Sequence, residues 1–578
     1  LNGFYYPYEI RHDDITEETI DIYARTAGVN GAMGMVIDLE ETNPAGWHNY
    51  HPEPLEHYTD AVIYEMHVRD FSIDKSGNFC YKGRFLAFVE KGVINAAGDK
   101  IGIDHLKELG VTHVHLMPSF DYQTVDETRL NVPQFNWGYD PQNFNCPEGS
   151  YSTNPYDGRA RVAEFKRLVH ALHCQGIRVI MDVVYNHTYA TADSPFNKIF
   201  NKYYYRLRGE NGEYFSNGSG CGNEIATERF MVRKYIIDSL VYWATEYKID
   251  GFRFDLMGLY DIETMNKIDE TLHAINPDII LYGEGWIGGD SPLADSKRAM
   301  KLNARHTPNI AFFSDDFRDT IKGNNFENRS RGYVNGATGS EEYVKEVMCG
   351  RIPHPQIPNL TKFAWTLSPC QTVNYVEAHD NLTLWDKLIY TNPTDSLDTR
   401  KKMDKMAAAC VFLAQGIPFI QAGQDFLRSK PLPGGAYDHN SYNSPDAVNS
   451  LKWDRKSEFR DVFDYYKGLI EFRKAHSALR MFTAEDIGRN MKFFDHLPQR
   501  IVGFGLYGDC ELEEIIVFFN PTNDDITLHA FGEYNVYIDG DNAGNKPLYT
   551  VCDDYIIKPH STMVMGRPYP QPEEEAAE

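Results

Sequence analysis

The chain has 578 residues, of which 42% are apolar and 24% are charged, and this composition supports a large buried core. Its formal net charge of −26 argues against nucleic acid and against an acidic ligand, because no cluster of Lys and Arg could offset the global repulsion. No apolar run approaches the roughly 18 residues that would span a bilayer, and the nine cysteines show neither zinc-ligand nor redox spacing. We therefore expect a neutral partner, no membrane, and one large domain with one or two smaller ones.

The N-terminal segment GFYYPYEIR (3–11) reads as a lone strand. Because a lone strand needs partners, we expect residues 1–58 to be the remnant of an upstream module plus a linker. The chain opens with Leu1 and shows no charged-then-apolar leader, so we also expect a targeting segment to be absent from this chain. The compartment is left open by the sequence.

Between about residues 60 and 425, short β-rich runs alternate with helical stretches such as 161–176 and 230–248. Eight apolar strands with helices between them predict a closed parallel (β/α)₈ barrel, which we assign to residues 59–485. An open doubly wound sheet is the alternative, but no Gly-rich phosphate loop follows any strand. The predicted strands are 61–70, 111–118, 177–187, 250–255, 279–284, 309–316, 372–380 and 417–423.

After about residue 485 the alternation stops, and short β-type runs are separated by Asn, Asp and Gly turns. This pattern predicts a small antiparallel β-sandwich at 486–568. The acidic residues 569–578 are predicted to be a disordered tail. The predicted fold class is α/β, a TIM barrel followed by an antiparallel β-sandwich domain. The sandwich strands are expected at 500–507, 514–521, 533–539 and 555–566.

Titratable and other polar side chains collect at the carboxyl ends of four predicted strands. On a parallel barrel these ends open into one mouth, so side chains from distant segments should meet there. A single Asp at a strand end is often structural, but a whole set arriving together is hard to explain in that way. The third strand brings Asp182, Asn186 and His187, the fourth Arg253 and Asp255, the fifth Glu284, and the seventh His379 and Asp380.

Carboxylates together with Arg and His suit glycoside hydrolysis, in which one carboxylate must be ionised and another must be protonated. Arg253 and Asp255 fall on the same face of their strand, so the guanidinium should keep Asp255 ionised, as a nucleophile requires. Glu284 lies in an apolar setting between ILYG and Gly285-Trp286, which should raise its pKa and suit it to be the general acid. Asp255 and Glu284 are 29 residues apart, about one βα unit, which favours the retaining geometry of about 5–5.5 Å between carboxyl groups.

An aromatic loop is predicted at 135–141, FNWGYDP, because a Trp-Gly-Tyr run next to proline suits neither a helix nor a central strand. The barrel places this loop after the second strand, on the side where the carboxylates gather. Tyr139 then suits a flat floor under a sugar ring and Trp137 a buttress of the loop, while Trp286 is a further candidate for stacking. His187 and His379 are expected to bond sugar hydroxyls, most strongly in the transition state.

Four stretches resemble, in the usual order, the short conserved motifs of the α-amylase superfamily, glycoside hydrolase family 13. The resemblance implies Asp255 as the nucleophile, Glu284 as the acid/base and Asp380 as the transition-state stabiliser. It further implies substrate contacts from the other motif residues Asp182, His187, Arg253, Met257, Trp286 and His379. The stretches are DVVYNH (182–187), GFRFDLMG (251–258), YGEGW (282–286) and YVEAHDN (375–381).

The aromatic loop closely resembles the Tyr-Asn-Trp-Gly-Tyr-Asp-Pro signature of type I pullulanases, with Phe135 in place of the first Tyr. Three further segments, 21–47, 421–430 and 438–446, are similar to the same family. The resemblance makes residues 1–58 the remnant of a starch-binding β-sandwich module and its linker. It also implies Asp438 and Asn440 as substrate contacts.

The resemblance implies a retaining hydrolase of bacterial type, extracellular or cytoplasmic, that cleaves α-1,6-glucosidic linkages in pullulan, amylopectin or related α-glucans. The chemistry requires no cofactor, and a structural calcium ion is compatible with the superfamily although no residues are assigned to it. The catalytic set alone leaves open an α-1,4-acting amylase or neopullulanase, an isoamylase-type glycogen debranching enzyme and a branching transferase. A non-catalytic starch-binding protein is disfavoured by the intact carboxylates, and the oligomeric state is left open.

Overall fold

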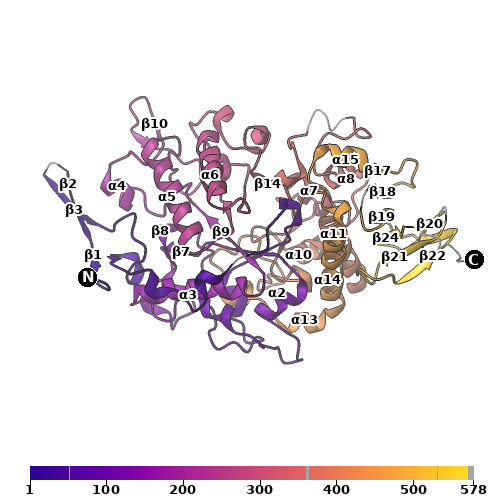
Figure 1. Cartoon of the computed structure of the whole chain (residues 1–578), viewed down its shortest axis with the longest axis horizontal. Coiled ribbons are helices and arrows are strands. Elements are labelled where there is room, and N and C mark those ends of the chain that lie inside the picture. Colours follow the sequence, from indigo (N-terminus) through magenta and orange to yellow (C-terminus); the bar gives the residue numbers. More distant parts are fainter. Residues whose placement is uncertain (13, 51, 359–363, 509, 530–531, 570–578) are drawn as a thin grey trace, which may run out of the picture.

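Eight parallel strands close into a barrel, as the sequence predicted. The computed structural model describes residues 1–578 except 13, 51, 359–363, 509, 530–531 and 570–578. The strands follow one another around the barrel in chain order, and the barrel lies between the N-terminal hairpin and the C-terminal sheet (Figure 1). They are β5 (Ile63–Met66), β6 (His113–Leu116), β9 (Arg178–Val183), β12 (Gly251–Phe254), β13 (Ile280–Gly283), β14 (Ala311–Phe313), β15 (Thr372–Asn374) and β16 (Ile417–Gln421).

The inside of the barrel is a packed core, as is usual for this fold. Side chains such as Ile63, Ile180, Tyr282, Phe313 and Phe419 are buried there in one apolar cluster. The other faces of the same strands pack against the surrounding helices in a second, larger cluster. Burial on both faces explains why the strands are almost continuously apolar in sequence.

The helices cover the outside of the barrel, and many begin at a capping side chain. Asp157, Asp261, Ser314 and Ser396 each accept a hydrogen bond from a backbone N–H in the first turn of their helix. The two helices predicted at 161–176 and 230–248 are α3 and α5. The longer helices are α2 (Ile103–Leu109), α3 (Gly158–His173), α5 (Phe230–Glu246), α6 (Ile262–Ile275), α7 (Asp315–Lys322), α8 (Glu341–Met348), α10 (Leu384–Thr391), α11 (Leu397–Leu413), α14 (Arg460–Ala475) and α15 (Ala484–Asn490). Shorter ones are α1 (Val68–Ser72), α4 (Pro195–Ile199), α12 (Asp446–Asn449) and α13 (Asp454–Glu458).

The aromatic stretch 135–140 is a loop, which confirms its prediction from the sequence. It connects β7 (Phe120–Tyr122) to β8 (Pro141–Pro147), two antiparallel strands that leave the barrel after β6. Gly138 has a φ of 95°, and a Cβ at this position would lie 3.0 Å from Cβ of Pro118. Glycine is therefore required for the loop to turn so close to the end of β6.

A six-stranded antiparallel sheet and a separate strand pair follow the barrel. Side chains of the sheet such as Phe518 and Val536 share an apolar cluster with Tyr555 and Ile557 of the pair, so the two sheets pack as a small sandwich. The sheet contains, in spatial order, β17 (Met491–Phe493), β18 (Val502–Tyr507), β19 (Glu514–Asn520), β24 (Ser561–Arg567), β21 (Tyr534–Ile538) and β22 (Tyr549–Val551), and the pair is β20 (Ile526–His529) with β23 (Asp554–Ile557). The predicted boundary at 485 stays a prediction.

The single strand predicted at 555–566 is wrong. It is interrupted between Ile557 and Ser561, and its two halves, β23 and β24, belong to different sheets. His560 has a φ of 49°, a left-handed conformation that turns the chain from one sheet to the other.

The lone strand predicted at 3–11 is also wrong. Pro7 divides the run, because proline has no N–H to contribute to a strand ladder. The first half, β1 (Tyr5–Tyr6), pairs with β4 (Gly34–Met35), and the second half, β2 (Tyr8–His12), pairs with β3 (Ile15–Thr19). The origin of residues 1–58 in an upstream module stays a prediction.

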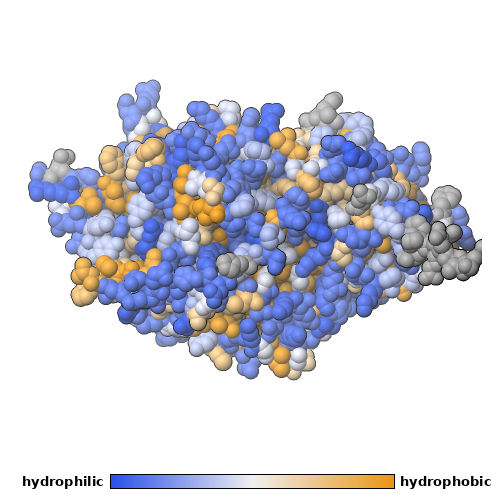
Figure 2. All heavy atoms as spheres, viewed as in Figure 1, coloured by the Kyte–Doolittle hydropathy of each residue, from blue (hydrophilic) through white to orange (hydrophobic). Residues whose placement is uncertain are grey.

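The face of the molecule in Figure 2 is mostly hydrophilic, and its apolar residues form small separate patches, one of them beside the N-terminus. Within the described part of the chain, none of the helices combines the length and the apolar character needed to cross a membrane. Apart from Tyr569, the predicted tail 569–578 lies outside the described residues.

Candidate active site

The parallel register of the barrel places predicted site residues side by side although they are far apart in sequence. Asp182 of β9 lies opposite Arg253 of β12, and Arg253 lies opposite Tyr282 of β13. Asp255 follows β12 directly and Glu284 follows β13 directly. The carboxyl ends of neighbouring strands thus bring three carboxylates and one guanidinium to the same mouth.

Arg253 is the centre of this group and is only 2% exposed. Its guanidinium lies 2.9 Å from Asp182 Oδ1, 2.9 Å from Asp255 Oδ1 and 2.6 Å from Glu284 Oε1. One cation cannot neutralise three buried carboxylates, and a charge left over in a buried site favours uptake of a proton.

Glu284 is a carboxyl group of this cluster whose surroundings favour the protonated form. Burial, together with the charges of Asp255 and Asp380, raises the pKa of Glu284 to about 7 against the opposing charge of Arg253. The prediction of an acidic group with a raised pKa is therefore confirmed. Its Oε2 accepts a hydrogen bond from the Leu256 backbone N–H at 2.9 Å, which fixes the orientation of the carboxyl group.

Asp255 is held at both of its carboxyl oxygens. Arg253 binds Oδ1, and the side-chain amide of Asn186 donates to Oδ2 at 2.8 Å. Neither oxygen is free to rotate away, so the group keeps one direction relative to Glu284. The distance between the Asp255 and Glu284 carboxyl groups, and with it the retaining geometry, stays a prediction.

The aromatic loop forms one side of the site. The Tyr139 hydroxyl donates to Asp182 Oδ2 at 2.7 Å, and its ring stacks on the His379 imidazole with 5.0 Å between ring centroids. Trp137 is 6% exposed, packs edge-on against His379, and donates its backbone N–H to the Tyr442 carbonyl oxygen at 2.9 Å. Trp137 therefore supports the loop from within, and Tyr139 is the half-buried ring of the pair.

The two predicted histidines have opposite electrostatic surroundings. His379 Nδ1 lies 2.8 Å from Glu65 Oε1. Burial acts to lower the pKa of His379, but the charge and hydrogen bond of Glu65 outweigh it, and the pKa is raised. Burial lowers the pKa of His187, whose Nε2 lies 3.0 Å from the Tyr139 carbonyl oxygen. The site thus favours a charged ring at His379 and a neutral ring at His187.

A cavity of about 600 Å³ opens beside Arg253, Glu284 and His379, and its volume is within the usual range for a ligand site. Its wall includes Glu284, His379 and Asp380 together with the predicted contacts Trp286 and Asn440. These residues come from the ends of β13 and β15 and from the long segment after β16, so the cavity is made by tertiary contacts alone.

Six predicted substrate contacts do not line this cavity: Trp137, Tyr139, Asp182, His187, Met257 and Asp438. Met257 is fully buried, and a Cβ placed on Gly283 would lie 2.9 Å from its sulfur, so it packs beneath the end of β13. This burial contradicts a contact between Met257 and substrate. Asp438 is 9% exposed, and its carboxylate accepts hydrogen bonds from the Asn440 backbone N–H at 2.9 Å and from the Ser444 hydroxyl. Asp438 therefore shapes the loop that presents Asn440.

Comparisons with known proteins agree with this geometry. Residues 79–205 match the family described as "Alpha amylase, catalytic domain". The pullulanase of Bacillus subtilis (strain 168) is 40% identical over 536 residues, which cover 91% of this chain and 71% of that protein. The chain belongs to the pullulanase family. A pullulanase variant from Paenibacillus barengoltzii, solved in complex with maltotriose, superimposes with a TM-score of 0.92 at 42% identity over 98% of this chain and 87% of that chain.

Members of the pullulanase family differ in length. Pullulanase A of Streptococcus pneumoniae serotype 4 (strain ATCC BAA-334 / TIGR4) is 31% identical over 84% of this chain, but the chain spans only 41% of that protein. The shared region carries the α-amylase-type catalytic domain, and a member of this family is a glycoside hydrolase.

Two buried titratable residues of this pullulanase-family site were not predicted from the sequence. Glu65 lies in β5 and binds His379, and His115 lies in β6 with its Nε2 3.1 Å from Asp182 Oδ2. Both are at most 1% exposed, in strands that are buried along their whole length. A titratable residue inside a strand buried on both faces needs a partner, and this signal could have found them.

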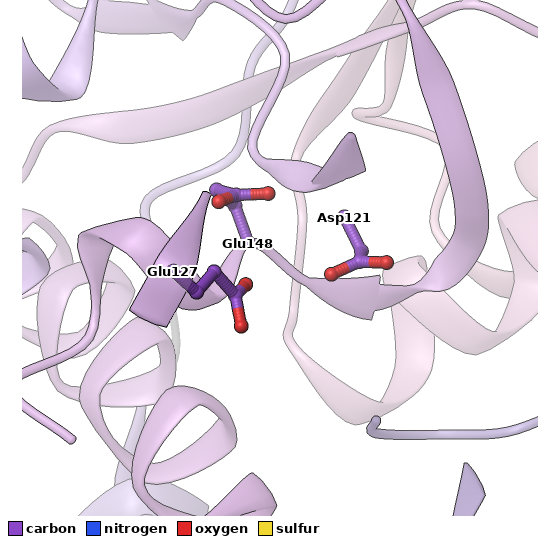
Figure 3. Close-up of side chains that lie close together, drawn as sticks. All are labelled: Asp121, Glu127 and Glu148. Atoms are coloured by element: carbon purple, nitrogen blue, oxygen red, sulfur yellow. The ribbon is translucent and has the colours of Figure 1, made fainter. Parts of the chain in front are cut away.

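Three buried carboxylates near β7 and β8 are potential ligands of a metal ion. Among the residues that the structure describes, Asp121, Glu127 and Glu148 are the one group of potential ligands within 4.8 Å of one another (Figure 3). The fully buried Arg161 lies 2.9 Å from Asp121 and 2.9 Å from Glu127. Glu148 accepts hydrogen bonds from backbone N–H groups at 2.8 and 3.0 Å. Because Arg161 already lies against Asp121 and Glu127, no residues are assigned to the ion that the superfamily allows.

Proposed function

We propose that this chain hydrolyses α-1,6-glucosidic linkages in branched α-glucans by double displacement. The observation that carries the proposal is that the guanidinium of Arg253 pairs with both Asp255 and Glu284. In the same cluster, the pKa of Glu284 is raised to about 7. A retaining glycosidase needs a fixed carboxylate as nucleophile and a neighbouring carboxyl group that is still protonated near neutral pH. The family relative solved with maltotriose supports an α-glucan as the substrate.

In the first step, Asp255 attacks C1 of the glucose unit at the cleavage position. The bond between C1 and O6 breaks as Glu284 gives its proton to the departing O6. Arg253 and Asn186 hold the two oxygens of Asp255, so the attacking atom is already oriented when the substrate arrives.

In the second step, the ionised Glu284 takes a proton from a water molecule. The resulting nucleophile attacks C1, the bond between C1 and Asp255 breaks, and the sugar leaves with its original anomeric configuration. One carboxyl group thus serves as acid and then as base, and a pKa near 7 suits both roles.

The sugar ring is held between the aromatic loop and the end of β15. Tyr139 supplies a flat apolar surface, and the charged ring of His379 donates to a hydroxyl group with more strength than a neutral donor. Asp380 lines the cavity, where a carboxylate favours the positive character of the ring in the transition state.

Hydrolysis of pullulan distinguishes the bond that is cleaved. Release of maltotriose identifies α-1,6 cleavage, and release of panose identifies α-1,4 cleavage. Panose as the product would overturn the proposed specificity while leaving the glycoside hydrolase chemistry intact.

Asp255→Ala and Glu284→Gln test the assigned roles. Loss of the general acid should lower kcat by about 10²–10⁴-fold, and loss of the nucleophile should abolish turnover. Glu485→Gln, which alters an exposed carboxylate on α15, is the matched control and should behave as wild type. Near-normal turnover of pullulan by either active-site variant would contradict the mechanism.

A further inference from the structure

A second pocket of about 340 Å³ lies beside the cavity that is lined by Glu284 and Asp380, and the two share Asp315. Helix α7 stands between them. Its Arg318 and Lys322 line the catalytic cavity, whereas Asp319 and Thr320 line the second pocket. The cavity and the second pocket therefore adjoin each other at Asp315, in the first turn of α7.

We propose that the second pocket binds a glucose unit of the same α-glucan chain whose branch is cleaved in the catalytic cavity. The inference rests on the proposed function and extends it, because it assigns a second contact point to a polymeric substrate. A short branched oligosaccharide should use this pocket less than amylopectin does.

An exposed aromatic ring gives the pocket a surface for a sugar. Tyr343 on α8 is 60% exposed and lines the pocket opposite α7. Helices α7 and α8 pack against each other, as Figure 1 also shows. A flat aromatic ring covers the C–H face of a glucose unit, while polar groups at the rim bind its hydroxyls. Ser340 and Thr320 provide such groups on both walls.

The pocket is held open by backbone contacts between α7 and the segment before α8. The N–H of Tyr333 donates to the Thr320 carbonyl oxygen at 2.9 Å, and the N–H of Val334 donates to that of Ile321 at 3.2 Å. At Gly332, an added Cβ would lie 2.3 Å from the backbone nitrogen of Gly323. The two walls therefore meet so closely that a side chain would force them apart, and the pocket exists before a ligand binds.

The charges around the pocket suit a neutral ligand with hydroxyl groups. Asp315 and Asp316 both pair with the ammonium group of Lys301, and Asp316 also lies 3.7 Å from Arg351 Nε. Asp319 lies 2.7 Å from Arg318 Nε, so three carboxylates meet three cations. Their negative charges are thus already compensated, which removes the main attraction for a metal cation. Carboxylate oxygens can accept several hydrogen bonds each, so they can still bind sugar hydroxyls.

Tyr343→Ala tests the proposal through the KM values for two substrates. We expect the KM for amylopectin to rise about tenfold relative to the KM for a short branched oligosaccharide. Tyr549→Ala is the matched control, because Tyr549 is another exposed ring, 43% accessible, on the edge strand β22 of the C-terminal sheet. The control should leave the ratio of the two KM values unchanged.

A binding assay without catalysis separates this inference from the proposed function. Retardation of the Glu284→Gln variant in a gel containing amylopectin should weaken when Tyr343→Ala is added. Equal retardation of the Glu284→Gln protein with and without Tyr343→Ala, together with an unchanged KM ratio, would overturn the inference. Retardation that appears only after calcium is added would also overturn it. A wild-type enzyme that cleaves neither substrate would refute the proposed function, and weaker retardation of the Tyr343→Ala protein would then still support glucan binding at this pocket.

Discussion

Glu65 decides the charge of His379, and Glu65→Gln isolates that effect because glutamine keeps the size of the side chain. Glu65 is 1% exposed, lies 2.8 Å from His379 Nδ1, and accepts the backbone N–H of the same residue at 2.7 Å. Without the carboxylate, burial dominates and lowers the pKa of the imidazole. The variant then offers the sugar a neutral donor in place of a charged one.

The size of the effect follows from the two kinds of hydrogen bond. Bonds to charged groups contribute about 1.5–3 kcal/mol and neutral ones about 0.5–1.5 kcal/mol, so the change should cost about 1–2 kcal/mol in the transition state. This corresponds to a fall of about 5–30-fold in kcat/KM for pullulan. In wild type, His379 loses its charge as the pH rises through its raised pKa, so the deficit of the variant should be largest on the acidic side and shrink above it.

Wild-type kcat/KM values with an unchanged pH dependence would refute the role given to the charge of His379. Glu485→Gln, on the surface of α15, serves as the control for loss of one carboxylate. The contact with His379 lowers the pKa of Glu65 in spite of its burial, so its ionised form stabilises the fold above the pKa of the unfolded chain, and that stability is lost as the pH falls. Rates should therefore be compared at a temperature at which circular dichroism shows both variants to be folded.

Glu284 should give the pH profile of kcat/KM an alkaline limb with an apparent pKa of about 7, because activity requires its protonated form; a rate that stays constant through neutral pH would contradict this. Asp182→Asn removes a fully buried partner of Arg253 and should lower the free energy of unfolding in urea by about 3–5 kcal/mol. A loss below about 1 kcal/mol, typical of an exposed pair, would show that Arg253 does not depend on it. Burial raises the pKa of Asp121 to about 7 against the charge of Arg161, so the folded chain holds a proton that the unfolded chain releases at lower pH. Stability should therefore fall as the pH rises from about 4 through 7, and Asp121→Asn should weaken this dependence; identical urea midpoints across that range in wild type would exclude it.

The sequence by itself determined the architecture and the chemical groups of this protein. Each of the eight barrel strands lies within its predicted run, because a strand buried on both faces is mostly apolar and can therefore be recognised from its own sequence. The same local reading placed Asp255 and Glu284 at strand ends, where a parallel barrel opens its mouth. Proline and glycine marked the aromatic loop in the same way.

Only the tertiary structure decided how these groups act on one another. Arg253 binds three carboxylates at once because the register of the strands determines which residues lie beside it. Asp182 lies in β9 on one side of Arg253, and Glu284 follows β13 on the other side. The role of Glu65 at His379 depends on the closure of the barrel, which joins the last strand to the first. Burial raises the pKa of Glu284 and excludes Met257 from contact with solvent and substrate. It depends on the packing of the whole fold, and no single segment determines it. The order of residues in the sequence therefore specifies which side chains reach the mouth of the barrel. The distances between these side chains and their exclusion from solvent, which exist only in the folded chain, specify the chemistry of each one.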